Sequence, residues 1–377
     1  MSPARCRLGG LPALAVVLCA LVVLGCQDTL PKATEIIRMR VLGSQVEVDG
    51  DPTRATPKPG EDSTVSFLTV FPKLSQTSSD VQTMLIGCTA PSRFSGGLPV
   101  CQEFLDAAAN GGAANIGKAL PAFKRRFHCS DLPASYAQFG TVSVQCLYED
   151  PLAQLTVPLD YAAKQVLLLG VVCERGDAYV DPTDPQIFGC EHDSGETIRV
   201  NTLVTVQQKP DQANHNPSLD ALTIRLDDGL WAAPPTMLPN ETQCRSSADP
   251  QSGPTSNAAD KGKPGQPLPL RDPGEHVIDL IYDAASRETD PTLHEPEDVE
   301  ITVYDTVGKM ERRFTVLAGT DKGTGKPAQI VGSVKWEGPG LHGGIPASGK
   351  LVRFFITLRD HRGGFSATSR ALCLYAQ

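Results

Sequence analysis

The stretch LVRFFITLRDHRGGFSATSRALCLY, residues 351–375, decides the fold class. Every second residue from Val352 to Leu358 is apolar, which is the period of a β-strand that buries one face. The segment DHRGG at 360–364 then offers a turn, because glycine readily adopts the positive φ that a tight hairpin requires. Residues 367–375 return as a second apolar strand. The stretch therefore predicts a β-hairpin with one face in a hydrophobic core.

Segments of strand length recur along the chain, some alternating and some continuously apolar. They lie at 37–41, 65–71, 81–88, 142–148, 166–173, 197–206, 222–226, 277–282, 299–304 and 313–317. In the first of them Ile37, Met39 and Val41 alternate with arginines, so we expect these three to share a buried face. Many short strands separated by turns predict an all-β protein. The segment CQEFLDAAAN at 101–110 is an exception and predicts a short helical insertion.

A change of composition separates two series of strands. Residues 207–218 read QQKPDQANHNPS, which is polar and rich in turn formers. We therefore expect a first β-sandwich domain at 35–210 and a second at 211–377. Within the second, residues 246–274 are rich in Pro, Gly and Ser and have no apolar period, which predicts a flexible loop.

The N-terminus has the features of an export signal. Two arginines precede an apolar run at 11–24, which is shorter than the about 20 residues of a transmembrane helix. The following VLGC at 23–26 resembles the lipobox of bacterial lipoproteins, in which aliphatic and small residues precede a cysteine. The resemblance implies a signal peptide at 1–25, a diacylglycerol thioether on Cys26, and acylation of its new amino group by a chain such as palmitate. Cleavage by ordinary signal peptidase, with Cys26 incidental, is the alternative.

The lipobox resemblance also implies a location. The mature chain would begin with a tether at 26–34 and be held to a membrane through Cys26. In Gram-negative lipoproteins an aspartate directly after the cysteine favours retention in the inner membrane, and here Gln27 occupies that position. We therefore expect a cell-envelope protein anchored in the outer membrane, on its periplasmic or its surface face.

The cysteines indicate disulfides. Two of the eleven lie in the predicted signal peptide and Cys26 takes the lipid, which leaves an even number for an exported chain. Their spacing suggests the sequential pairs Cys88–Cys101, Cys129–Cys146, Cys173–Cys190 and Cys244–Cys373, although eight cysteines allow 105 connectivities. A zinc site is the alternative, but the chain has no CxxC and no Cys/His pair with finger-like spacing.

Charge and the remaining motifs argue against several classes of function. A formal net charge of −9 makes nucleic acid a poor candidate partner. The glycine-rich GTDKGTGK at 319–326 lacks the strand–helix context of a phosphate loop and is read as a hairpin loop. Asp360, His361 and Ser366 are read as turn residues rather than a catalytic triad, because one exposed turn cannot supply an oxyanion hole.

Two groups of oxygen ligands are candidates for weak calcium binding. Residues 294–298 read HEPED and, with Glu288 and Asp290, form an acidic loop that we interpret as a solvated charge cluster. At the joint, Asp211, Asn214 and Asn216 are interpreted as parts of a rigid linker with Asn turns. Calcium is the alternative in both places. We therefore predict no catalytic residue, no resident metal and no cofactor.

Four segments carry a resemblance to a known group. EIIRMRVLG at 35–43, ANHNPSL at 213–219, ITVYDTVGKMER at 301–312 and RFFITLRDHRGGFS at 353–366 are similar to lipoproteins of myxobacteria and their relatives. The resemblance implies two tandem immunoglobulin-like β-sandwich domains, and it carries over no catalytic residue.

These observations lead to three hypotheses of function. The first is a lipid-anchored, non-catalytic binding or adhesion module whose partner is an envelope protein or a glycan. The second is a structural accessory subunit of an envelope assembly, in which edge strands pair with a partner. The third is a hydrolase with an unrecognised site, which ranks last because no nucleophile, base or metal constellation stands out.

Overall fold

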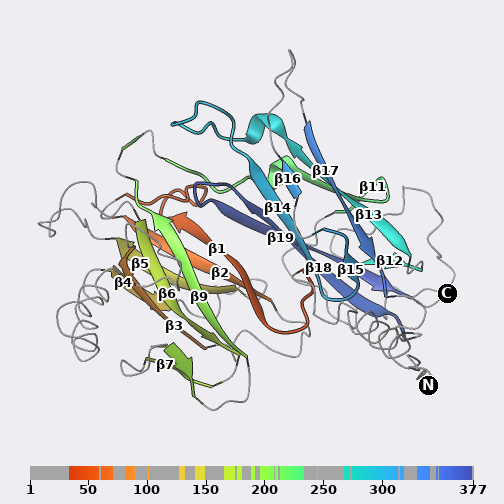
Figure 1. The fold of residues 1–377 in the computed structure, drawn as a ribbon, viewed down its shortest axis with the longest axis horizontal. Helices are drawn as coiled ribbons and strands as arrows, with labels where there is room; N and C mark the ends of the chain where they lie inside the picture. Colours follow the sequence, from red (N-terminus) through yellow and green to blue (C-terminus); the bar gives the residue numbers. More distant parts are fainter. Residues whose placement is uncertain are drawn as a thin grey trace, which may run out of the picture. The chain divides into compact units, whose positions relative to one another are not determined.

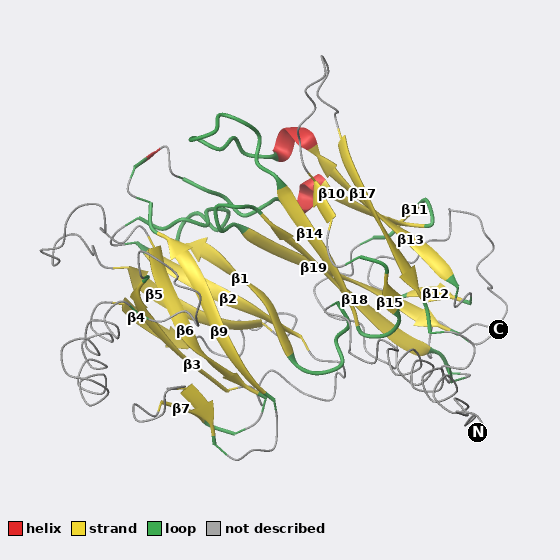
Figure 2. Cartoon of the chain, viewed as in Figure 1, coloured by secondary structure: helices red, strands yellow, loops and turns green. Residues whose placement is uncertain are grey.

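A computed structural model places the strands in two β-sandwiches that follow one another along the chain (Figure 1; Figure 2). Residues Thr34–Gln377 form one unit. The structure describes residues 34–58, 61–70, 82–90, 101, 127–131, 141–148, 165–174, 176–180, 188–191, 196–207, 209–210, 213–232, 244, 267–271, 274–312, 315–317, 329–339, 345–346 and 348–375.

Seven strands make the first sandwich. They are β1 (Arg40–Val48), β2 (Asp62–Val70), β3 (Gln82–Thr89), β4 (Phe127–Asp131), β5 (Thr141–Tyr148), β6 (Gln165–Cys173) and β9 (Thr197–Thr205). One sheet has the order β1-β2-β5-β4 and the other β3-β6-β9, with antiparallel pairing throughout. In chain order this is the ABED and CFG arrangement of a constant-type immunoglobulin domain. A hairpin of β7 (Ala178–Val180) and β8 (Phe188–Cys190) is inserted between β6 and β9.

The second sandwich repeats the scheme with additional short strands. Its strands are β10 (Leu222–Leu226), β11 (Gly229–Leu230), β12 (Leu268–Leu270), β13 (Glu275–Asp283), β14 (Val299–Asp305), β15 (Lys309–Met310), β16 (Thr315–Leu317), β17 (Gln329–Glu337), β18 (Lys350–Arg359) and β19 (Phe365–Leu374). The sheets have the orders β11-β10-β13-β17-β15 and β12-β19-β18-β14-β16. The β10-β13-β17-β15 run corresponds to ABED, and β19-β18-β14 corresponds to GFC. The prediction of an all-β protein of tandem immunoglobulin-like sandwiches is therefore confirmed.

Each sandwich buries its own apolar core. In the second, Trp336 is fully buried and its ring meets Phe354 edge to face, with ring centroids 5.2 Å apart. The inward positions of β18 are those that the alternation predicts from Val352 to Leu358. In the first sandwich Phe67 and Leu168 lie at the centre of a separate cluster. Burial of each such side chain stabilises the fold by about 1.5–3 kcal/mol relative to an exposed one.

A third apolar cluster joins the two sandwiches. Ile36 from the N-terminal segment and Leu42, Leu68 and Val70 from β1 and β2 pack against Phe355 and Phe365 of β18 and β19. Phe355 lies on the face of β18 that is turned away from the core of the second sandwich, yet only 2% of it is exposed. The strand β18 is therefore buried on both faces along most of its length, and the two sandwiches share a continuous hydrophobic contact.

This contact corrects the expectation for residues 37–41. The strand β1 begins only at Arg40, and Ile37 is 48% exposed instead of sharing a buried face with Met39. The backbone register of β1 against β2 shifts between Val41 and Gly43, so the alternation changes phase there. The second sandwich covers what would otherwise be an outer face, and this explains why Ile36 and Leu42 are buried in place of Ile37 and Val41.

Replacing Gly43 by valine is expected to destabilise the contact between the sandwiches. A Cβ atom on Gly43 would lie 2.2 Å from Cε2 of Phe365, so the buried ring would have to move. We expect the free energy of unfolding to fall by about 2–3 kcal/mol in urea denaturation. In a Phe365→Ala background the same change should cost much less, because the clashing ring is gone. Equal losses in both backgrounds would contradict this account.

Two disulfides are present among the residues that the structure describes in full. Cys173 at the end of β6 is bonded to Cys190 of the inserted hairpin. Cys244 is bonded to Cys373 of β19, with 129 residues of separation, and packs beside Tyr375. These are two of the four pairs that the spacing suggested. They attach the inserted hairpin to the first sandwich and Cys244 to the last strand of the second.

The other cysteines are described only in part. Cys101 is fully buried and disulfide-bonded. The register of β4 and β5 places Cys129 opposite Cys146, which suits a bond between these two strands. The pairings of Cys88, Cys101, Cys129 and Cys146 stay predictions.

Several other predictions fall outside the described residues. They concern the signal peptide and Cys26, the helical insertion at 102–110, most of the loop at 246–274, Asp211 and the hairpin loop at 319–326. One part of the 246–274 prediction is wrong, because Leu268–Leu270 form β12, which pairs in parallel with β19. Among the described residues, no helix has the length and apolar character needed to cross a membrane.

Candidate functional site

The tip of the β18–β19 hairpin meets the segment 213–218 where the chain passes from the first sandwich to the second. The turn residues Asp360 and Arg362 contact this segment and two glutamates that lie far away in the sequence. We call the group of Asn214, His215, Glu288, Glu297, Asp360 and Arg362 the joint cluster.

Arg362 is the centre of the joint cluster. Its Nε donates to Glu297 Oε1, and its Nη2 donates to Glu288 Oε2 over 2.6 Å. Its Nη1 donates to the carbonyl oxygen of Ala213 over 2.9 Å. Glu288 also bonds the ring of His215 through Oε1. One guanidinium therefore connects the hairpin tip, the linker and the loop before β14.

The asparagines of the linker also bond across the joint. The Nδ2 of Asn214 donates to Asp360 Oδ2 over 3.1 Å, and the Nδ2 of Asn216 donates to the carbonyl oxygen of Val46 over 2.7 Å. The Oδ1 of Asn216 accepts a bond from the amide of Phe365 over 3.0 Å. The sequence predicts Asn turns within the linker, whereas in the structure these side chains hold one sandwich against the other.

Asp360 holds the conformation of its own turn. Its Oδ1 accepts bonds of 2.8 Å from the amides of Arg362 and Gly364. Gly363 has a φ of +102°, and a Cβ on Gly364 would lie 2.2 Å from Asp360 Oδ2, so both glycines are required. His361 is exposed while Ser366 is buried. Asp360 thus has the turn role that the sequence predicted.

The acidic loop is only in part the solvated cluster that the sequence suggested: His294 and Glu295 are exposed, but Glu297 is buried. Only 7% of Glu297 is exposed, and both Glu297 and Glu288 are paired with Arg362. Asp290 accepts bonds from the amides of Thr292 and Leu293, so it shapes the loop. Among the described residues, no group of three or more His, Cys, Asp or Glu side chains is arranged to hold a metal ion. An arginine occupies the centre that a cation would need.

The burial of Glu297 has a consequence that depends on pH. Desolvation raises the pKa of this carboxyl to about 7, although the charge of Arg362 acts in the opposite direction. Because the pKa of Glu297 is higher in the folded protein than in the unfolded chain, where it is near 4.5, protonation of this carboxyl stabilises the folded state. That stabilisation is complete below pH 4.5 and is lost as the pH rises through 7.

We therefore expect Glu297→Gln to be more stable than the wild type above pH 7, by about 1–3 kcal/mol, because the amide avoids burial of a charge. The two proteins should have similar stability near pH 4.5. Thermal unfolding from pH 4.5 to 8.5 measures the difference, with Glu300→Gln on β14 as the matched control. A difference that is largest at low pH would contradict the assignment.

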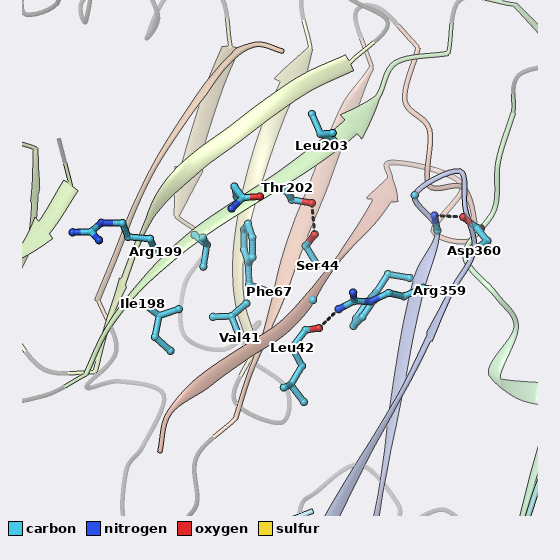
Figure 3. Close-up of a pocket in the computed structure, with 16 residues that line it drawn as sticks. Val41, Leu42, Ser44, Phe67, Ile198, Arg199, Thr202, Leu203, Arg359 and Asp360 are labelled. Carbon is cyan, nitrogen blue, oxygen red and sulfur yellow. Dashed lines mark hydrogen bonds between the residues drawn. The ribbon is translucent and has the colours of Figure 1, made fainter. Parts of the chain in front are cut away.

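A groove lies beside the joint cluster, between β1 and β9 of the first sandwich and the tip of the β18–β19 hairpin (Figure 3). Its volume is about 340 Å³. Figure 3 shows Ser44 and Thr202 facing each other, with their hydroxyl oxygens 2.6 Å apart, so the two strands touch at this point. The Nη2 of Arg359 donates to the carbonyl oxygen of Leu42 and closes the other side. We call this feature the β1–β9 groove.

The lining of the β1–β9 groove is mixed in character. Val41 and Ile198 give apolar walls and are partly exposed, while Phe67 lies deeper and is only 1% exposed. Arg199 and Asn201 are exposed on β9 at the rim. Sequence reasoning assigned 197–206 to a strand but did not identify the groove, because its two walls come from β1 and β9, which are far apart in the chain.

A second cavity, of about 400 Å³, lies on the linker side of the joint cluster and includes Tyr282, Glu288 and Glu297 in its lining. Tyr282 is fully buried, and burial raises the pKa of its hydroxyl. Solvent does not reach this hydroxyl, so a ligand could not bond it without a rearrangement. We therefore regard the β1–β9 groove as the better candidate for binding.

Comparisons with known proteins give a limited result. No protein-family model matches the chain, and no curated protein matches it. Among solved structures, the adhesin InvE of Yersinia pseudotuberculosis is 7% identical with a TM-score of 0.19, over 89% of this chain and 60% of that one. Tandem Ig repeats of Dlar are 6% identical with a TM-score of 0.18, over 89% and 97% of the two chains. The Ig1-2 module of the Drosophila receptor phosphatase DLAR is also 6% identical, with a TM-score of 0.18 over 88% and 99%. Likeness of this degree carries no argument about function, and the fold assignment depends on the strand order given above.

Proposed function

We propose that the chain is a lipid-anchored, non-catalytic binding module of a bacterial cell envelope, and that it engages its partner through the β1–β9 groove. The observation that carries this proposal is an accessible groove with apolar walls and a polar rim, held between two sandwiches that are fixed to each other. Binding sites commonly lie on loops and edges that a rigid scaffold positions. The shared apolar cluster and the joint cluster supply that rigidity here.

The proposed anchor would enter the fold beside the apolar cluster that joins the two sandwiches, to which Ile36 belongs. Thr34 and Ile36 exchange backbone bonds with Asp305 at the end of β14, over 3.1 and 2.7 Å. Only residues 27–33 separate Thr34 from Cys26, and a chain of that length reaches at most about 28 Å. A lipid on Cys26 would therefore hold the fold near the membrane surface and limit how far its binding groove can extend from it.

The Cys26→Ser variant tests the anchor. Without the thiol there is no thioether, so the variant is expected to leave the membrane fraction and to partition into the aqueous phase of a Triton X-114 extraction. A Cys19→Ser variant, altered within the predicted signal peptide, is the matched control and should stay with the membrane. Identical partitioning of Cys26→Ser and wild type would show that the anchor proposal is wrong.

Cross-linking in intact envelopes, followed by affinity purification of the tagged protein and mass spectrometry, tests the binding role. A protein recovered at a fixed ratio would support binding of an envelope protein and would name its process. Absence of any cross-linked protein, combined with retention on envelope polysaccharide, would move the proposal to a glycan.

A further inference from the structure

The loop between β13 and β14, residues 284–298, has an exposed tip. Residues 292–295 are all exposed, and 68% of Leu293 is accessible, the highest fraction among the large apolar side chains that the structure describes. Figure 2 shows the loop beyond the start of β14, next to the short 3-10 helix η7 (Ala284–Ser286). Single apolar residues on a surface are common and by themselves indicate nothing. Leu293 differs from them because its position is firmly fixed.

Backbone bonds hold the tip in one conformation. The carboxylate of Asp290 accepts bonds from the amides of Thr292 and Leu293 over 2.6 and 2.9 Å. The carbonyl oxygen of Asp290 accepts from the amide of His294, and its amide donates to the carbonyl oxygen of Glu295, both over 2.8 Å. His294 has a φ of +57°, which is uncommon for residues other than glycine. A tip held in this way has little backbone freedom left to lose on binding, which favours affinity.

The base of the loop is fixed to the rest of the fold. Glu288 and Glu297, which flank the tip, both pair with Arg362. The amide of Glu297 donates to the carbonyl oxygen of Glu288 over 2.8 Å, and the Nη1 of Arg287 donates to the carbonyl oxygen of Glu297 over 3.2 Å. The tip therefore projects from a base that the joint cluster holds. Binding residues are often found on loops that a rigid scaffold positions.

The charges around Leu293 favour a protein partner over a lipid. Residues 288–298 contain five acidic residues and no Lys or Arg. Arg362 pairs with two of them, which leaves the exposed Glu295 and the carboxylate of Asp290 beside the tip. Bonds from the tip amides, that of Leu293 foremost, lower the pKa of Asp290 and keep it ionised. An anionic tip is repelled by the negative surface potential of a membrane that contains anionic lipids.

The tip also lies far from the point at which the proposed anchor enters the fold. The loop precedes Val299 at the start of β14, whereas Thr34 and Ile36 bond Asp305 at the end of this strand. A strand of this length spans about 20 Å. A lipid on Cys26 would therefore act on the opposite end of β14 and leave the tip accessible to other proteins of the envelope.

We propose that the 292–295 tip is a second contact surface, in which Leu293 enters an apolar pocket of a partner protein that is bordered by Lys or Arg. This inference goes beyond the proposed function, because the tip does not line the β1–β9 groove. Burial of the leucine side chain supplies affinity. The attraction of Asp290 and Glu295 for the basic border orients the partner and selects against pockets with an acidic border.

Photocrosslinking in intact cells tests this surface in the full-length chain. The variants are Leu293→p-benzoylphenylalanine and, as the matched control, Val331→p-benzoylphenylalanine, since Val331 is 59% exposed on β17. Illumination should capture a protein from position 293 and none from position 331. Mass spectrometry of the product should place the crosslink among apolar residues with Lys or Arg beside them. Adding Glu295→Lys should lower the yield at least about fivefold, whereas Glu311→Lys, an equal charge change at another exposed residue of the second sandwich, should leave it unchanged.

Four results overturn the inference. They are a lipid as the product at position 293, the same protein captured from both positions, no captured protein at position 293, and a yield that Glu295→Lys leaves unchanged. Asn201→p-benzoylphenylalanine, at the rim of the β1–β9 groove, tests the proposed function in the same cells. Capture from position 201 alone rejects the second contact surface and supports the groove. Capture from position 293 alone rejects the groove and supports the second contact surface.

Discussion

Replacing Arg362 by methionine is expected to lower the free energy of unfolding by about 3–5 kcal/mol at pH 8.5, because the folded state must then either bury the carboxylate of Glu297 unpaired or hold it protonated far above its ordinary pKa. Glu297 is 7% exposed and its Oε1 accepts a bond from Arg362 Nε. The same change removes the ion pair with Glu288 and the bond to Ala213. Methionine keeps the aliphatic length of the side chain, so the loss reports mainly on charge and hydrogen bonding.

Acidification should reduce this loss. The pKa of Glu297 is already raised to about 7 by desolvation, and removal of the arginine charge raises it further. At pH 5.5 the carboxyl of the variant is therefore protonated in the folded state and no longer needs a cation. Chemical denaturation of wild type and Arg362→Met at pH 5.5 and 8.5 measures the two differences.

A double-mutant cycle with Glu297→Gln isolates the pair. The double variant should recover most of the stability lost in Arg362→Met, because a neutral amide replaces the unpaired charge. Losses that simply add, or a loss that is equal at both pH values, would mean that Arg362 acts through the linker carbonyl rather than through Glu297.

The architecture was predictable because it depends on local patterns. The alternation from Val352 to Leu358 and the turn at 360–364 specify a hairpin whichever residues surround it. The same is true of the continuous apolar run in β6, which is buried in the first sandwich. Strand order could be anticipated only at the level of an immunoglobulin-like layout, since pairing is decided by packing between distant segments.

The contact between the sandwiches was not predictable in the same way. Phe355 stands among the outward positions of β18, and its apolar character is a weak signal that this face is covered. Nothing near it in the sequence identifies Leu42 or Val70 as its partners. Gly43 shows the same limit, because only the fold reveals that the ring of Phe365 occupies the space a side chain would need.

The joint cluster illustrates how far turn chemistry can be followed. The turn sequence correctly predicted a local role for Asp360, whose carboxylate accepts bonds from backbone amides two and four residues away. Arg362 lies in the same turn, but its partners Glu288 and Glu297 are 74 and 65 residues away. Long-range ion pairs leave no periodic signal in the sequence. An acidic loop whose sequence suggests full solvation can therefore contain one partner of a buried ion pair.

Removal of the Cys244–Cys373 disulfide is the other change with a large expected effect. The bond closes a loop with a sequence separation of 129, which in the chain-entropy description stabilises the fold by about 5 kcal/mol through the unfolded state. Cys244→Ala with Cys373→Ala, changed together so that no thiol is left behind, should show this loss in urea denaturation. Both cysteines are buried, at 1% and 0% exposure, and they pack beside Tyr375, so part of the loss comes from missing contacts.

The matched control for this prediction is the shorter disulfide of the first sandwich. Cys173 and Cys190 are separated by 17 residues, and the same description gives about 3 kcal/mol for their removal by paired alanine substitutions. The informative result is which disulfide costs more unfolding free energy when it is removed, because loop entropy requires a larger loss for the bond that closes the longer loop. Equal losses would show that packing around the sulfur atoms, rather than closure of the chain, sets their value. Free thiols at Cys244 and Cys373 in the wild type would reject the bond itself, and the hydrogen bond from the Tyr375 hydroxyl to the Cys244 carbonyl would be a remaining polar contact of Cys244 with the second sandwich.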